Sequence, residues 1–151
     1  MFSRYLLGLV LITLLPTAYG AEEIESVTDK IQHAFISETM GELPENYLDQ
    51  QGVTVVTEHS ITYSERSDHA HHANWKSVEA WLQGRKIERG VEGGGDIPSR
   101  GRGELMWCHS GYCLYSLEGV MAHNHIFLSE VWYRETPQGP RIYGLKIIDG
   151  D

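Results

Sequence analysis

The last third of the sequence constrains the fold most, because strand-like segments follow one another there with only short turns between them. Alternating and β-branched apolar residues predict strands over 103–109, 112–119, 120–134 and 141–148, with a turn at 136–140. Strands joined by such short turns pair antiparallel, and helical patterns precede them. The 151 residues have room for one ordinary domain. The sequence therefore predicts an α+β fold, with N-terminal helices packed on a curved, mostly antiparallel sheet.

Apolar residues at helical spacing predict the helices of the first half. The first runs over 22–40 and ends at Gly41. A short helix follows over 44–50, beginning at a proline, and another runs over 75–83 and ends at Gly84. The apolar stripe of the first helix consists of Ile24, Val27, Ile31, Ala34 and Phe35.

Three segments between these elements differ in composition. Residues 53–63 are rich in β-branched side chains and predict a strand, whereas residues 64–73 are polar and predict a loop. Residues 85–103 combine six glycines with five basic residues, which predicts a mobile surface loop. Ile87 and Val91 could form a short edge strand within it.

The N-terminus has the pattern of a secretory signal peptide. A ten-residue apolar run over 6–15 is followed by Pro16 and by small residues that end at Gly20. The run is too short to span a membrane, so we expect cleavage after Gly20. This divides the chain into a signal peptide, 1–20, and a single domain, 21–151. We expect an exported protein, periplasmic or secreted, with no membrane association once the signal is removed.

The net charge excludes one class of partner. The chain carries 21 acidic and 12 basic residues, a formal charge of −9. Nucleic acid and anionic lipid both repel such a protein, so we expect no nucleic-acid partner.

The two cysteines predict a disulfide within a hairpin. With Ser110-Gly111 as a two-residue turn, His109 faces Tyr112 and Cys108 faces Cys113. Directly opposite residues of a non-hydrogen-bonded pair have Cα atoms about 4.5 Å apart, a distance that a disulfide spans. Free thiols, or a zinc site that includes the intervening histidine, are the alternatives.

The order of elements resembles the NTF2-like (SnoaL-like) superfamily over residues 22–149. The resemblance lies in the amphipathic first helix, the segments LDQQGVTVV and NWKSVEAWL, and the ending PRIYGLKIIDGD. It implies a cone in which helices and the inner face of the sheet enclose a pocket. Its members include isomerases, dehydratases, cyclases and non-enzymatic binding modules, so the fold alone does not select a function. The resemblance also implies a homodimer formed through the exposed sheet face.

Two histidines on the predicted strand 120–134 are the main candidates for chemistry. Alternation places His123 and His125 on one face with Phe127, and we expect this face to line the pocket. His59 and Tyr143 would approach the same space from the first and last strands. Acid–base catalysis by these histidines and Tyr143, metal binding by the two histidines, and plain hydrogen bonding within the sheet are the three alternatives.

Two loops carry further candidates. Arg100 or Arg102 could contact a carboxylate or phosphate group of a ligand, or belong to a flexible surface connection. His69, His71 and His72 form a short histidine tract, which we interpret as a solvated loop.

Together these features predict an exported protein that binds a small molecule, with His59, Phe127, Arg100 and Arg102 as ligand contacts. Isomerase, dehydratase or hydrolase activity is one extension of this prediction, and no cofactor is expected. A protein-interaction module and a metal-binding protein that uses His123 and His125 are the alternatives.

Overall fold

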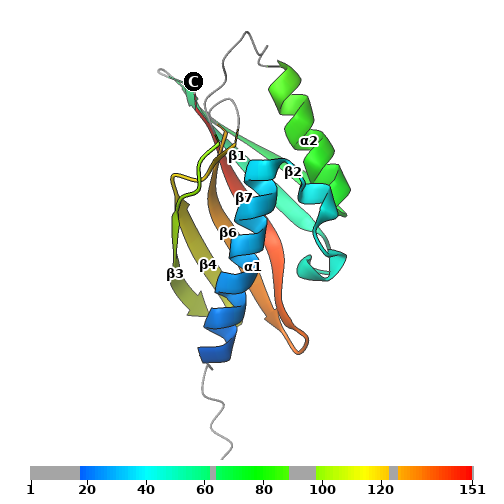
Figure 1. Cartoon of the computed structure of the whole chain (residues 1–151), viewed down its shortest axis with the longest axis vertical. Coiled ribbons are helices and arrows are strands. Elements are labelled where there is room, and N and C mark those ends of the chain that lie inside the picture. Colours follow the sequence, from blue (N-terminus) through cyan, green and yellow to red (C-terminus); the bar gives the residue numbers. More distant parts are fainter. Residues whose placement is uncertain (1–17, 62–63, 89–97, 123–125, 151) are drawn as a thin grey trace, which may run out of the picture.

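A computed structural model describes residues 18–61, 64–88, 98–122 and 126–150, and shows helices packed on one face of a twisted sheet (Figure 1). The predicted α+β class is therefore confirmed. The helical elements are α1 (Ala18–Ser37), the short 3₁₀ turns η1 (Met40–Glu42) and η2 (Glu45–Tyr47), and α2 (Trp75–Glu88). The strands are β1 (Val53–Ile61), β2 (Ser64–His72), β3 (Arg102–His109), β4 (Tyr112–Glu118), β5 (Met121–Ala122), β6 (Ile126–Thr136) and β7 (Gly139–Gly150).

The seven strands form one sheet in the order β2-β1-β7-β6-β4-β3, and β5 pairs with β6. Every pairing is antiparallel except that of β1 with β7, the first and last strands, which lie parallel. The sheet is thus mostly antiparallel, as predicted. We call the face toward the helices the inner face and the opposite face the outer face.

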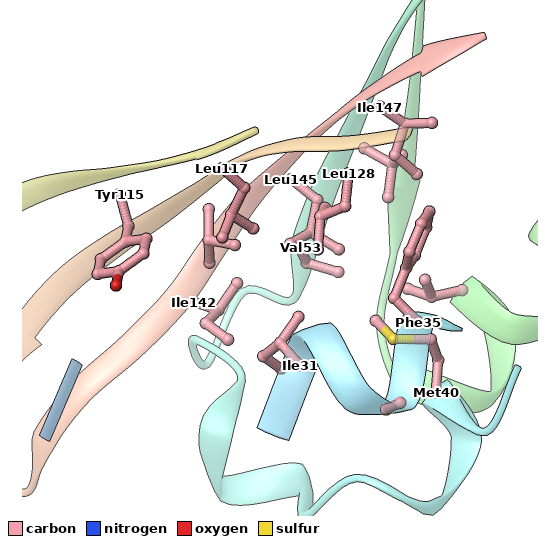
Figure 2. Close-up of a cluster of buried hydrophobic side chains, with 14 of the residues drawn as sticks. Ile31, Phe35, Met40, Val53, Tyr115, Leu117, Leu128, Ile142, Leu145 and Ile147 are labelled. Carbon is pink, nitrogen blue, oxygen red and sulfur yellow. The ribbon is translucent and has the colours of Figure 1, made fainter. Parts of the chain in front are cut away.

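The hydrophobic core lies between α1 and the inner face (Figure 2). The predicted stripe of α1 is buried, and Phe35 and Met40 pack against the sheet together with Trp75 of α2. Alternate residues of the central strands complete the core: Val53, Val55, Tyr115, Leu117, Leu128, Val131, Tyr133, Ile142, Leu145 and Ile147. Burial of this apolar surface is the main stabilising contribution to such a fold.

The predicted hairpin disulfide is confirmed. Cys108 pairs with Cys113 in the strand register, their Cα atoms lie 4.1 Å apart, and their sulfurs are bonded. Ser110 and Gly111 both have positive φ, at 51° and 80°, which is the backbone of the two-residue turn that favours a twisted hairpin.

The prediction of one strand over 120–134 is wrong. Met121 pairs with Phe127 and Ala122 with Ile126, so the segment contains two antiparallel strands. A bulge between Leu128 and Glu130 also shifts the alternation of β6.

Other predicted boundaries are also corrected. The segment 64–73 is not a loop, because residues 64–72 form β2 at the edge of the sheet. Gly84 and Ile87 lie inside α2, so neither a helix end nor a strand is present there; Val91 lies outside the described residues. The first helix ends at Ser37 and Glu38 adopts a positive φ of 60°, before Gly41 is reached. The predicted helix at 44–50 is only the turn η2.

Among the described residues, no helix combines the length and apolar character needed to cross a membrane.

Candidate functional site

A histidine held between two aspartates marks one end of the inner face. His59 Nε2 lies 2.8 Å from Asp68 Oδ2 of β2, and His59 Nδ1 lies 3.6 Å from Asp149 Oδ2 of β7. The three residues continue the inner-face positions of neighbouring strands, since Thr57 pairs with Asp68 and His59 with Asp149. The ring is 14% exposed and Asp149 is 6% exposed, whereas Asp68 is 39% exposed, so the contact with Asp149 is shielded from water and the contact with Asp68 is partly open to it. We call His59, Asp68 and Asp149 the histidine cluster.

Other polar groups lie on the same inner face. Thr57 is buried, and within the described part of the chain its hydroxyl has no hydrogen-bond partner. His72 is buried against α2, where Nδ1 lies 2.7 Å from Ser77 Oγ and the ring packs edge-on against Trp81. Burial, with a smaller contribution from His71, lowers the pKa of His72 below its ordinary value. Polar groups therefore lie along the inner face of β1 and β2, with His72 opposite Val53 at one end and the histidine cluster at the other, which we call the polar end of the inner face.

A small cleft opens beside the histidine cluster. Its apolar walls come from α1, α2 and the strands, and Ile126 in its wall pairs directly with Asp149. Directly opposite residues have Cβ atoms about 5 Å apart, so the cleft and the cluster occupy the same end of the inner face. The space is about 20 Å³, enough for about one water molecule. The lining residues are Phe35, Glu38, Met40, Glu79, Leu82, Gln83, Ala122 and Ile126.

A larger and more open groove runs along the exposed side of α1. Its volume is about 430 Å³, within the size range of small-molecule sites. Arg100 reaches it from the segment before β3, and its Nη2 donates to His33 Nδ1 at 3.2 Å. The lining residues are Asp29, Lys30, His33, Ala34, Thr39, Glu42, Leu43, Pro44 and Arg100. We call this the α1 groove.

The outer face carries a strip of aromatic rings. Trp107 packs edge-on against Trp132, Trp132 against Tyr143, and Tyr143 against Tyr112, with centroids 5.5–6.4 Å apart. We call these four residues the aromatic strip. Trp107 and Tyr112 are 43% and 44% exposed, and with Met106 they are the large apolar side chains exposed in the described residues. Such concentration on one face is typical of an interaction surface.

The structure separates the residues predicted to share one pocket. His59 lies on the inner face, but the bulge in β6 places Phe127 on the face opposite Tyr133, and Tyr143 belongs to the aromatic strip. The expectation that Phe127 and Tyr143 approach the same space as His59 is therefore wrong.

The remaining predicted site residues are dispersed. His123 and His125 lie outside the described residues, although their neighbours Ala122 and Ile126 line the cleft, and their roles stay predictions. Arg100 lies in the α1 groove, whereas Arg102 is exposed on β3 and pairs with Glu118 in the strand register. His69 and His71 are exposed on β2.

One group of three potential metal ligands is close together in the described part of the chain. The donor atoms of Cys108, Cys113 and Glu135 lie within 4.8 Å of one another, but the two sulfurs are already joined in the disulfide. His109 cannot complete a zinc site there, because it pairs with Tyr112 on the outer face.

Sequence reasoning grouped Asp68 with the histidine tract 69–72 and did not identify Asp68 or Asp149 as a partner of His59. Asp68 fell in the segment predicted as a loop, and Asp149 lay one residue beyond the predicted last strand. The alternation Leu145, Ile147, Asp149 was the available signal, because it continues the buried face of β7.

No family model and no curated protein matches the chain. Solved structures with a similar fold include a domain of unknown function with a cystatin-like fold from Nostoc punctiforme (16% identity, TM-score 0.49), covering 88% of this chain and 78% of that one. An NTF-2 like protein of unknown function from Silicibacter pomeroyi matches at 10% identity and a TM-score of 0.43, covering 84% and 95%. The beta subunit of benzoate 1,2-dioxygenase from Burkholderia mallei matches at 9% identity and a TM-score of 0.46, and the match covers 84% of this chain and 88% of that one. The fold class itself rests on the chain's own topology.

Proposed function

We propose that this chain is an exported domain that binds a small molecule at the polar end of the inner face, with His59 as its acid–base group. The observation that carries the proposal is the placement of both ring nitrogens of His59 toward carboxylates, one of which is buried. Imidazole exchanges protons near neutral pH, and flanking carboxylates orient the ring. Isomerisation, dehydration and hydrolysis all require such a group.

Binding at this end needs more space than the cleft of about 20 Å³ provides. The α2 helix contacts η1 more extensively than it contacts any strand. We therefore propose that α2 moves away from the sheet when a ligand enters, and that its packing on η1 serves as the pivot. Leu82 and Gln83, which line the cleft from α2, would move with the helix and so widen the cleft.

Thermal-shift screening tests this proposal. Wild-type protein is screened against a panel of small alcohols, carbonyl compounds and carboxylic acids, beside the variants His59→Gln and His109→Gln. His109 is an exposed histidine on the outer face, so its variant controls for the loss of an imidazole. We expect compounds that stabilise the wild type and His109→Gln but not His59→Gln. A panel without any stabilising compound, or equal shifts in all three proteins, contradicts the proposal.

The outer face favours a second function, self-association. The strand register defines three parallel rows across β7, β6, β4 and β3. The middle row contains Trp132 and Trp107 of the aromatic strip. One flanking row contains Arg134 and His109, and the other contains Glu130 and Glu104. In full, the rows are Arg141-Arg134-Tyr112-His109, Gly144-Trp132-Leu114-Trp107 and Lys146-Glu130-Ser116-Glu104.

The charges of these rows on β6 are complementary under a two-fold axis. If the axis runs along the middle row, the rings of two copies meet and the flanking rows exchange places. Arg134 then faces Glu130 of a second copy and His109 faces Glu104 of that copy, whereas at the β7 end of the rows Arg141 faces Lys146. This arrangement places the Arg134–Glu130 pairs of the central strand beside an apolar centre, as in protein interfaces generally.

Sedimentation velocity tests the second function. We expect wild-type dimers, monomeric Trp107→Glu, and an unchanged dimer for Lys76→Glu, a control on the exposed side of α2. A wild type that stays monomeric at the highest concentration, or a Trp107→Glu variant that dimerises equally, removes this function.

A further inference from the structure

The α1 groove combines opposite charges in balance. Lys30 and Arg100 are cationic, Asp29 and Glu42 are anionic, and all four line the groove. Arg100 Nη2 donates to Nδ1 of His33, which also lines the groove. The formal charge of the groove is therefore zero, in a protein whose net charge is −9.

Arg100 is the cation most available to a ligand. Within the described part of the chain its guanidinium forms one hydrogen bond, to His33, and no ion pair. A guanidinium has five N–H donors in a planar fork that matches a carboxylate, so most of its donors remain for a ligand. Lys30, in contrast, donates to Tyr47 Oη at 3.1 Å and lies over that ring.

The rest of the lining defines the other parts of a ligand. Ala34, Leu43 and Pro44 provide an apolar wall beside the charged groups. The carboxylates of Asp29 and Glu42 repel a simple anion but attract an ammonium group. The groove is net-neutral and offers a guanidinium without an ion pair, two carboxylates and an apolar wall. It therefore fits a molecule with a carboxylate, an ammonium group and an apolar body between them.

We propose that the α1 groove is a binding site for a small zwitterion that carries a carboxylate, a short apolar body and an ammonium group. Arg100 holds the carboxylate, Leu43 and Pro44 contact the apolar body, and Asp29 and Glu42 hold the ammonium group. The site is separate from the histidine cluster, since no residue of that cluster lines the groove. The proposal therefore goes beyond the function proposed above and does not depend on it.

Isothermal titration calorimetry at low salt provides the test, with 6-aminohexanoate as the zwitterion, and with hexanoate and inorganic phosphate as simple anions. We expect 6-aminohexanoate to bind the wild type more tightly than either anion does. Arg100→Gln should weaken its binding about tenfold or more, because a charge-assisted bidentate contact is lost. Arg102→Gln is the matched control, an exposed arginine two positions away on β3, and should bind as the wild type does.

Three further variants make the result decisive. Asp29→Asn/Glu42→Gln should weaken 6-aminohexanoate but not hexanoate, and His59→Gln should change neither. Arg100→Lys retains the positive charge but loses the planar fork of donors. If its thermal midpoint equals that of the wild type, weaker binding reports a lost contact and not a misfolded protein. The proposal is overturned if the wild type binds no 6-aminohexanoate, if phosphate or hexanoate binds as tightly, or if Arg100→Gln and Arg102→Gln have equal effects.

Discussion

Reduction of the Cys108–Cys113 bridge should lower the free energy of unfolding by a small and calculable amount. The two cysteines are five positions apart, so the bridge closes a very short loop. In the chain-entropy model a closed loop of about six residues contributes about 2.2 kcal/mol at 25 °C. Little else should be lost, because β4 keeps its pairing with β6 and Gly111 keeps its carbonyl bond to Glu135 N–H.

Urea unfolding followed by tryptophan fluorescence, with and without a phosphine reductant, measures this difference. The slope of free energy against urea should hardly change, because so few residues are constrained in the unfolded chain. The double variant Cys108→Ser/Cys113→Ser should show no response to the reductant. A loss close to zero, or one above about 4 kcal/mol, would refute the loop-entropy reasoning. Sedimentation of the reduced protein should show unchanged self-association, since the strand ladder, and not the bridge, positions Trp107.

The remaining predictions concern the inner face and two turns. Burial lowers the pKa of His72 in the folded state below its ordinary value of 6.5. The free energy of unfolding should therefore fall as the pH drops below 6.5, because protonation then favours the unfolded chain. Urea midpoints measured across this pH range should show the fall in the wild type and a smaller one in His72→Gln. Leu128→Ala should cost about 2–5 kcal/mol in urea unfolding, whereas Met106→Ala, at an exposed site, should stay within about 0.5 kcal/mol. Gly111→Ala should cost about 1 kcal/mol through its positive φ alone, since the added methyl meets open space. Gly101→Ala should cost more in the same assay, because its methyl would overlap the Glu118 carbonyl oxygen.

The sequence predicted those elements whose local chemistry agrees with their tertiary position. The stripe of α1 and the strands β3, β4 and β7 have strong periodicity, and the Ser110-Gly111 turn fixes the register that joins the cysteines. Local signals failed where tertiary packing decides. The strand β2 has few apolar residues because it lies at the sheet edge, and its pairing with β1 gives it a strand conformation. Gly84 remains helical, and Trp81 and Leu82 of the preceding turn pack against the core.

The candidate site was less predictable than the fold. His59 was identified, but its partners come from strands that are distant in sequence, and only the register of β1 with β2 and β7 brings them together. The bulge in β6 separated Phe127 from the inner face, and no residue type in that segment signals a bulge. Arg100 was a candidate by its charge alone, and only the fold places it against α1.

The parallel pairing of β1 with β7 has a consequence for how the molecule is assembled. In the described chain β7 is the one strand that connects β1 and β2 to β6, β4 and β3. Until residues 139–150 are available, neither β1 nor β6 has β7 to pair with, so the two groups of strands stay separate. The inner face on which α1 packs is then incomplete. We therefore expect a ribosome-bound chain to stay incompletely folded until its last strand emerges, and a truncation that removes β7 to abolish the native sheet instead of shortening it.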